Sequence, residues 1–302
     1  MVYQKYIYSD IEALGSDFSE SYQTEVYQLD SGDVGEREVA ALPSMTLHYV
    51  RHDATLRFVE RPVMRGVGLW VVDESPRCVQ WRGEALGDRD LVVQQGGHEY
   101  DYILPAGSQG AMIELDYNLS RELGFGDLYV GPIRCSRRML DQLSMCVRGV
   151  IRACRHRGGE VEAEQLFLWQ AEIVRMIRKV IGDWELGGEI AARVNGGYAV
   201  ISLASEWMRA QGAGGCLDKL AQELEISPRT LNRLFHRWAG MGPGQYLSIM
   251  RMHALRRALI GADVQRGAVK EYAYALGYQH LGNMAQRYKE LFGESPSETV
   301  RR

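Results

Sequence analysis

Side chains that can recognise hydrogen-bonding edges are concentrated where the sequence reads SPRTLNRLFHR. Ser227 followed by Pro228 predicts a helix start, because serine caps the first free amides and proline suits the first helical position. Helical spacing turns the apolar residues inward and leaves Arg229, Asn232 and Arg233 outward. Arginine can donate two hydrogen bonds to guanine, and asparagine can pair in a similar way with adenine. The segment therefore predicts a helix that reads base edges in a major groove.

A first helix precedes this candidate reading helix. Its inward positions have helical spacing and are Leu217, Leu220, Ala221 and Leu224. Two short helices joined by a tight turn, the second one basic, are typical of a helix-turn-helix unit, here at about residues 217–238. Arg237 lies near the end of the second helix and is expected to contact phosphate. The alternative is that the charged face is only solvated.

The same arrangement recurs at about residues 268–292, which makes that alternative weaker. The expected inward positions are Val269, Tyr272, Ala273 and Leu276, then, after a turn at Gly277, Met284, Tyr288 and Leu291. One uninterrupted helix is expected between the two units, over 244–260. Its length of about 25 Å could hold two reading helices roughly one DNA turn, about 34 Å, apart.

Three segments together resemble the AraC/XylS family of bacterial transcription regulators. They are LDKLAQELEISPRTLNRLFHRWAGMGPGQYL, RMHALRRALI and ALGYQHLGNMAQRYKELFGESPSETVRR, and they span about the last 100 residues. The resemblance implies base contacts from the two reading helices, with backbone contacts near their ends. The implied base contacts are Arg229, Asn232, Arg233, Leu281, Gly282 and Gln286, and the backbone contacts are Arg237 and Lys289.

The chain departs from the usual pattern of that family in both units. Glu225 stands where the first turn usually has glycine, so strain is expected there. His280 replaces the usual small N-cap residue, and Gln286 stands where arginine is frequent. Leu281 and Gly282 carry no hydrogen-bonding side chain. We therefore expect the second unit to read thymine methyl groups, DNA shape or backbone more than base edges.

The N-terminal part predicts an α+β fold overall, with β-structure ahead of the helices. Segments rich in β-branched and aromatic residues alternate with turn signals about every ten residues, which favours a barrel or a sandwich. The expected strands are 44–50, 55–59, 68–72, 78–81 and 110–115. The region is weakly similar to the cupin-like effector domains of the same family. We expect a cupin-like β-barrel with a helical hairpin, followed by an all-α domain with two helix-turn-helix units.

The hairpin is predicted from two amphipathic stripes joined by Gly158 and Gly159. The first stripe contains Leu140, Leu143, Val147, Val150, Ile151 and Cys154; the second contains Leu166, Trp169, Ile173, Val174, Ile177, Val180 and Ile181. Both stripes could pack on the barrel, or part of them could form the interface of a homodimer. The basic run from Arg148 to Arg157 lies on the polar side and favours a solvated face.

These patterns divide the chain into an effector-binding and dimerisation domain at 1–183, a glycine-rich linker at 184–197 and a DNA-binding domain at 198–302. Residues 198–302 hold 14 Lys and Arg against 9 Asp and Glu, whereas the whole chain carries a net charge of −4. A basic C-terminal part on an acidic remainder suggests that only the former faces a polyanion.

The sequence supports the candidate effector contacts less strongly than the DNA contacts. Trp70 and Trp81 could line an apolar pocket or only pack in the core, and Arg61 with Arg65 could hold an anion. His98 is the residue closest to a metal-ligand pattern, but no second histidine follows two residues later, and a metal-dependent oxygenase needs several converging ligands. We predict no metal site, cofactor, catalytic residue or enzymatic activity.

The five cysteines are scattered without a CxxC pair, and no segment reads as a signal peptide or a spanning helix. These features predict a cytoplasmic protein without a membrane partner. The expected function is a transcription regulator that binds double-stranded DNA at a promoter or operator and responds to a small-molecule effector. It would contact RNA polymerase if it is an activator. The alternative is a regulator controlled by a partner protein.

Overall fold

The computed structural model describes residues 2–17, 21–87, 90–125, 131–187, 196–211, 216–260 and 268–301. The chain separates into two compact units. The N-terminal unit comprises Met1–Val26, Asp33–Trp81 and Ala85–Arg193, and the C-terminal unit comprises Tyr27–Gly32, Arg82–Glu84 and Val194–Arg302.

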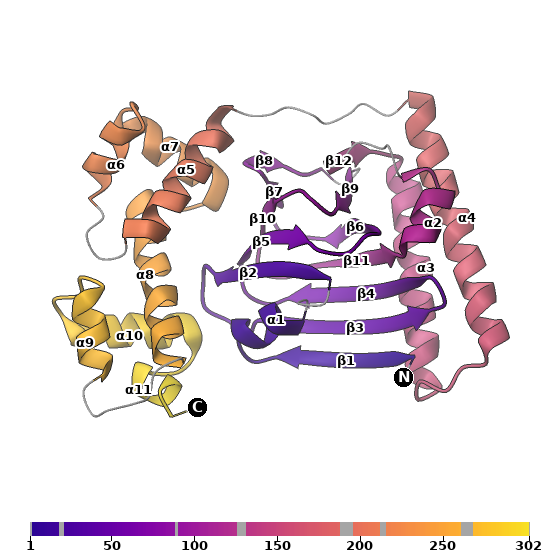
Figure 1. Ribbon diagram of the computed structural model, residues 1–302, viewed down its shortest axis with the longest axis horizontal. Coiled ribbons are helices and arrows are strands. Elements are labelled where there is room, and N and C mark those ends of the chain that lie inside the picture. The colour runs from indigo at the N-terminus through magenta and orange to yellow at the C-terminus, as the bar shows by residue number, and fades with distance from the viewer. Residues whose placement is uncertain are drawn as a thin grey trace. The chain divides into compact units, whose positions relative to one another are not determined.

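Two antiparallel sheets form the centre of the N-terminal unit (Figure 1). The seven-stranded sheet has the order β1 (Tyr3–Tyr8), β3 (Gly35–Leu42), β4 (Met45–His52), β11 (Ser108–Leu115), β6 (Val67–Glu74), β9 (Asp90–Gln95) and β12 (Gly131–Arg134). The five-stranded sheet has the order β2 (Tyr22–Gln28), β5 (Leu56–Pro62), β10 (Tyr100–Leu104), β7 (Gln80–Trp81) and β8 (Glu84–Ala85). Each of the five segments expected as strands contributes to one of these sheets.

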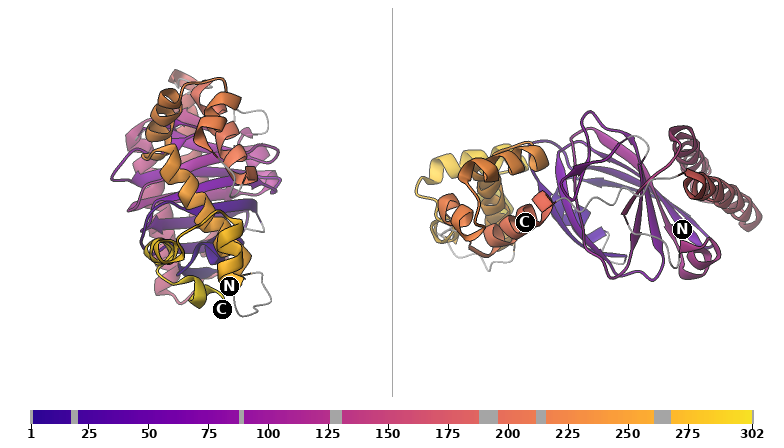
Figure 2. Two further views of the ribbon diagram at one scale, coloured as in Figure 1. Left: turned by 90° about the vertical axis from the view of Figure 1, so that its left-hand side faces the viewer. Right: turned by 90° about the horizontal axis from the view of Figure 1, so that it is seen from above.

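The expected closed barrel is not found among the described strands. The two sheets stay separate and face each other as a sandwich (Figure 2). The spacing of strand and turn signals in the sequence could not distinguish a barrel from a sandwich, because both alternate inward and outward residues along every strand. The choice depends on which strands pair at the sheet edges, and those pairings join segments far apart in the chain.

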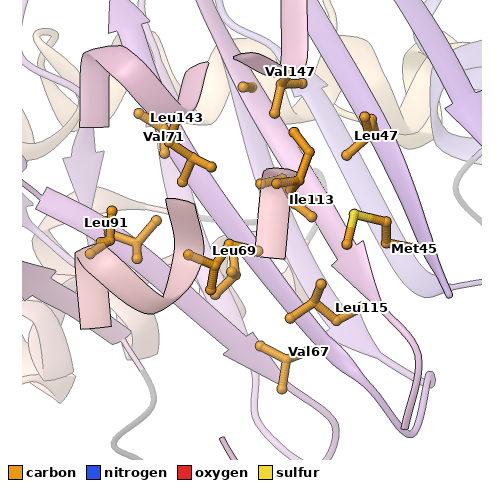
Figure 3. Packing of buried hydrophobic residues seen from close by; sticks show 14 of the residues in the cluster. Met45, Leu47, Val67, Leu69, Val71, Leu91, Ile113, Leu115, Leu143 and Val147 are labelled. Carbon is orange, nitrogen blue, oxygen red and sulfur yellow. The ribbon is translucent and has the colours of Figure 1, made fainter. Parts of the chain in front are cut away.

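Helices α3 (Arg137–His156) and α4 (Ala163–Gly187) lie beside the sheets in Figure 1. The six residues of the first expected stripe are all buried, and they pack with the outward side chains of the seven-stranded sheet. Figure 3 shows Leu143 and Val147 of α3 among Leu47, Val71 and Ile113 of the strands. The apolar stripe of α3 is therefore buried against the sheet within the N-terminal unit. Helices α1 (Ile11–Asp17) and α2 (Tyr117–Glu122) are short.

The C-terminal unit is mainly helical. Its helices are α5 (Gly196–Gln211), α6 (Leu217–Glu223), α7 (Pro228–Ala239), α8 (Pro243–Ile260), α9 (Ala268–Ala275), α10 (Leu281–Phe292) and α11 (Pro296–Thr299). Helix α8 has 18 residues, or about 27 Å at the rise of an α-helix. It runs between the group α5–α7 and the group α9–α11 (Figure 1).

The expected linker at 184–197 overlaps both neighbouring helices. Helix α4 continues to Gly187 and α5 begins at Gly196, while the part between lies outside the described residues. Among the helices of the described ranges, none has the length and apolar character required to cross a bilayer.

Candidate nucleic-acid interface

The first helix-turn-helix unit consists of α6 and α7. Two backbone hydrogen bonds close the turn between them: Glu225 N–H donates to the Gln222 carbonyl at 3.1 Å, and Ile226 N–H donates to the Ala221 carbonyl at 3.0 Å. Glu225 has a φ of 54°, in the left-handed region where glycine is favoured. The strain expected from the sequence at this position is therefore present.

Helix α7 begins as its sequence predicts. The Ser227 hydroxyl accepts a hydrogen bond from the backbone N–H of Thr230 at 3.1 Å, and Pro228 occupies the first helical position. The helix ends at Gly240, whose φ of 71° lets the chain turn away. The predicted N-cap is confirmed, and it fixes where each later residue of the helix points.

The two faces of α7 differ in polarity. Its buried residues are Leu231, Phe235 and Trp238, while Arg229, Asn232, Arg233 and Arg237 are exposed. Within the described ranges, none of these arginines forms an ion pair. Arg229, Asn232 and Arg233 lie in the first half of the helix, which is the part that enters a major groove in this motif. Arg237 lies in the last turn.

An aromatic cluster holds α7 on α8. The ring centroids of Phe235 and Trp238 lie 5.7 Å apart with planes at 83°, and Tyr246 of α8 lies 5.3 Å from Phe235 and 5.2 Å from Trp238. All three side chains are buried. Such tilted and edge-to-face contacts are favourable beyond the area they bury. These contacts set the orientation of α7 on α8, the helix that joins the two helix-turn-helix units.

The second unit, α9 and α10, has the same turn hydrogen bonds. Gly277 N–H donates to the Tyr274 carbonyl at 2.9 Å, and Tyr278 N–H donates to the Ala273 carbonyl at 3.0 Å. Here glycine occupies the left-handed position, with a φ of 80°. His280 is the N-cap of α10 and its side chain makes no capping hydrogen bond. The second unit thus has the relaxed turn and the weaker helix start.

The base-facing positions implied for α10 lie on or near its surface. Gly282 and Gln286 are exposed and Leu281 is half-buried. The Gln286 side-chain amide donates to the carboxylate of Glu290 at 2.9 Å, so a base would have to compete with that bond. Lys289 is exposed in the last turn. These positions offer few free donors.

Two polar residues of α10 were missed by the sequence reasoning. Asn283 and Arg287 are exposed, and their places follow from the buried residues Met284 and Tyr288 on the same helix. Helical spacing alone could have found them, but the resemblance directed attention to other positions. The sequence reasoning was also wrong about Tyr272, which was expected to face inward and is exposed on α9.

A buried polar network supports α10. Arg256 of α8 donates to the Glu294 carboxylate at 2.5 Å, and the Thr299 hydroxyl donates to the same carboxylate at 2.8 Å. The hydroxyl groups of Tyr288 and Thr299 lie 2.8 Å apart. Arg256 is 2% exposed, so the network lies in the interior of the C-terminal unit. It connects α8, α10 and α11. Ser295 and Glu298 complete a capping box at α11.

A second contact ties the turn of this unit to α8. The Tyr278 hydroxyl donates to the Ser248 carbonyl at 3.4 Å. Burial raises the pKa of Tyr278 to about 12, so the phenol stays protonated and can donate. The first helix-turn-helix unit is thus attached to α8 through an aromatic cluster, and the second through ring contacts of Phe292 together with a buried polar network.

Of the candidate effector residues, the two tryptophans are brought together, and the charged ones are not part of that group. Trp70 and Trp81 are buried and both rings lie near Tyr102, with centroid distances of 5.3 and 6.0 Å. Arg61, Arg65 and His98 are exposed, and Arg61 pairs with Glu99. Within the described part of the chain, no three His, Cys, Asp or Glu side chains are grouped to hold a metal ion.

Sequence comparison places a known domain at this region. Residues 220–302 match the family model described as a helix-turn-helix domain. The chain is 35% identical over 85 residues to the XylDLEGF operon transcriptional activator of Pseudomonas putida, and the match covers 28% of this chain and 26% of that protein. It is 33% identical over 103 residues to the probable thc operon regulatory protein of Rhodococcus erythropolis, covering 34% and 31%. The chain thus matches about a quarter to a third of the length of these relatives.

Solved structures of similar proteins include the AraC-like transcriptional activator CuxR, with 14% identity, a TM-score of 0.43, and coverage of 86% of this chain and 96% of that one. A probable AraC family transcriptional regulator from Rhodopseudomonas palustris is 26% identical, with a TM-score of 0.32 and coverage of 34% and 96%.

Proposed function

We propose that the protein is a transcription regulator of the AraC/XylS type that binds specific sequences of double-stranded DNA, because residues 220–302 match a helix-turn-helix domain and resemble transcriptional activators over that region. The observation that carries the proposal is the duplicated turn: both units close with the same pair of backbone hydrogen bonds, and each presents a 12-residue helix. Helix α8 spaces them by about 27 Å, which suits two adjacent major-groove segments.

In this proposal the residues of α7 have separate roles. Arg229, Asn232 and Arg233 contact base edges, because they are exposed on the first half of the helix. Arg237 contacts the phosphate backbone from the last turn, and Lys289 does so from α10. The base-facing residues of α10 are Leu281, Gly282 and Gln286.

The N-terminal unit supplies control in the same proposal. Residues 1–183 form a cupin-like effector-binding and dimerisation domain, 184–197 the linker and 198–302 the DNA-binding domain. A small molecule bound in the first domain changes DNA binding by a homodimer, which contacts RNA polymerase if it activates. Large apolar side chains remain exposed on the hairpin for dimerisation: Met145 at 68%, Phe167 at 59% and Leu168 at 59%. The protein would act in the cytoplasm.

A second candidate is control by a partner protein instead of a small molecule. The same exposed residues Phe167 and Leu168 favour it, because an apolar patch on a helix can also receive another protein. The two candidates differ in one requirement. Small-molecule control needs an enclosed pocket with a few convergent polar groups, whereas partner control does not.

The test uses a DNA site selected from a random library with the full chain. Arg233→Ala should lower affinity for that site by about 1–3 kcal/mol and relax preference at one base pair, because a bidentate contact is lost. Arg237→Ala should weaken binding to selected and random DNA alike. Arg152→Ala, an exposed arginine of α3, is the matched control and should change neither. Equal losses on both DNAs for Arg233→Ala would contradict its base-reading role.

A further inference from the structure

A small cavity lies between the two sheets of the N-terminal unit. It has a volume of about 30 Å³, which is room for roughly two water molecules. Its lining comes from both sheets and includes Phe58 and Glu60 of β5, Trp70 of β6 and Tyr102 of β10. Met112 of β11 also lines it, and its flexible side chain could move to admit a larger guest.

Aromatic rings form the walls of the cavity. The rings of Phe58 and Tyr102 are stacked with centroids 5.2 Å apart, and the ring of Trp70 lies 5.3 Å from that of Tyr102. A ring attracts a cation to any face that is open to the cavity, most strongly where water is excluded. All three side chains are buried.

Glu60 places a carboxyl group in the lining of the same cavity. It is 4% exposed, and the Gln94 side-chain amide donates to it at 3.4 Å. Burial raises its pKa to about 7, although hydrogen bonds from Tyr102 and Gln94 oppose that rise. A bound cation would let Glu60 ionise without the cost of an isolated buried charge.

Within the described ranges, the other titratable groups that face Glu60 supply no cationic partner for it. They are Glu114 of β11, Tyr22 of β2, and Tyr100 and Tyr102 of β10. Glu114 adds negative charge, which also raises the pKa of Glu60. Tyr22 and Tyr102 stay neutral, because burial raises the pKa of each well above its usual value.

Glu114 already has its own partners. Burial would raise its pKa, but the nearby His48 ring, the hydrogen bond from Ser21 and the charge of Arg37 outweigh that effect, and its pKa is lowered. The His48 Nε2 atom lies 3.6 Å from the Glu114 carboxylate, and the Ser21 hydroxyl donates to it at 3.2 Å. These groups therefore compensate Glu114 and not Glu60.

His52 provides a second polar group in the cavity lining. Burial lowers its pKa to about 4, so the imidazole is neutral near pH 7. Its ring donates to the Val34 carbonyl, and within the described ranges Nδ1 has no hydrogen-bond partner although it is buried. In that tautomer Nδ1 can only accept a hydrogen bond. The cavity thus offers an unfilled acceptor to an N–H or O–H group.

From this arrangement we propose that the cavity binds a small organic ammonium ion, with Glu60 as its counter-ion and the rings of Phe58, Trp70 and Tyr102 around it. This inference rests on the proposed small-molecule response and names the chemical class of the ligand. A carboxylate ligand fits less well, because it would meet the carboxylate of Glu60, which repels negative charge. A neutral ligand would leave the ionised form of Glu60 unpaired.

Binding is measured on the full chain with ¹³C-methyl-labelled methionine, and the Met112 methyl resonance is assigned with Met112→Leu. Ethylammonium chloride at pH 8 should shift this resonance saturably, whereas equal concentrations of potassium chloride, ethanol or sodium acetate should not. Glu60→Gln keeps the side-chain shape but removes the charge, and should weaken ethylammonium binding at least about tenfold. Glu162→Gln, an exposed acid of the same unit, is the matched control and should bind as the unaltered protein does.

The pH profile tests the same contact without any substitution. A proton on Glu60 competes with the cation, so affinity should be full above pH 7 and fall as the pH drops through the pKa of about 7. At pH 6 binding should be about tenfold weaker than at pH 8, because one pH unit below the pKa leaves about a tenth of the groups ionised. Glu60→Gln should remove this dependence.

Three results would overturn the inference: no saturable shift with ethylammonium, equal binding by Glu60→Gln, or tighter binding of acetate. The pH profile of the unaltered protein keeps the test valid even if Glu60→Gln fails to fold. Specific DNA binding is assayed on the same preparation. A protein that binds its selected DNA site but no ammonium ion would overturn this inference and leave the proposed DNA-binding function intact.

Discussion

The two helix-turn-helix units share the same backbone hydrogen bonds in their turns but differ in turn strain and in the N-cap of the second helix. The first has a strained turn, with Glu225 at a φ of 54°, followed by a well-capped helix whose Ser227 bonds to the backbone. The second has a relaxed turn at Gly277 and an N-cap, His280, without a side-chain hydrogen bond. The better-capped helix α7 has the exposed arginines Arg229, Arg233 and Arg237, whereas α10 has one, Arg287.

The difference indicates that the two helix-turn-helix units have different roles in DNA binding. A capped α7 on an aromatic cluster holds its arginine side chains in a fixed register, which reading base edges requires. Helix α10 offers Gly282 and a Gln286 already bonded to Glu290, but its buried Arg256 network fixes its position. We expect the first unit to supply specificity and the second to supply position and backbone affinity.

The largest effect is expected where the second unit is anchored. Arg256→Met should destabilise that unit by about 3–5 kcal/mol, because it leaves the Glu294 carboxylate without its buried partner. Hydrogen exchange of α10 amides in the full chain should rise, while exchange in α7 changes less. Arg257→Met, at an exposed position of the same helix, is the control. Equal changes in both reading helices would show that the units are not anchored separately.

Removing the cap should affect only the first unit. Ser227→Ala should destabilise α7 by about 1 kcal/mol, since the amide of Thr230 loses its acceptor. His280→Ala should have almost no effect on α10, whereas His280→Ser should stabilise it. Exchange rates of the amides in the first turn of each helix give the readout. A similar loss for Ser227→Ala and His280→Ala would remove the contrast.

Exchanging the turn residues should act in opposite directions. Glu225→Gly should stabilise the first unit by about 0.5–1 kcal/mol, because glycine adopts a positive φ without strain, although it adds chain entropy when unfolded. Gly277→Ala should destabilise the second unit by about 1 kcal/mol for the converse reason. Urea unfolding of the full chain measures both. Destabilisation by Glu225→Gly would mean that the Glu225 side chain contributes more than the strain costs.

The smallest effect is expected on recognition by the second unit. Gln286→Ala should lower affinity for the selected DNA site by less than about 0.5 kcal/mol, because the Glu290 carboxylate already holds the amide. Asn283→Ala and Arg287→Ala test the two exposed residues that sequence reasoning missed. A loss for Gln286→Ala as large as that for Arg233→Ala would show that both helices read bases equally.

Local features could be predicted from the sequence. Ser227 and Pro228 define a helix start by their own chemistry, and the strain at Glu225 follows from a non-glycine residue in a turn that needs a positive φ. The buried stripe of α3 was predicted residue by residue, because helical periodicity depends only on neighbours in the chain. The spacer helix was predicted to within one residue of its start.

Features that depend on distant pairing could not be predicted. The sandwich is defined by ladders such as β11 with β4 and β6, and these join strands separated by long stretches of sequence. Glu60 and His52 looked like ordinary strand residues until two sheets enclosed them. Tyr272 fitted an inward helical position, yet α9 is too short and exposed to bury it. In each case the environment comes from another part of the fold.

Hydroxyl-radical footprinting of the full chain on its selected DNA site tests the central claim most directly. If α7 and α10 enter adjacent major grooves from one stiff spacer, two protected segments should appear about one helical turn, roughly 10 base pairs, apart on one face of the duplex. Arg233→Ala should then weaken protection at a single segment. Protection of one segment only, unchanged by Arg233→Ala, would contradict the account.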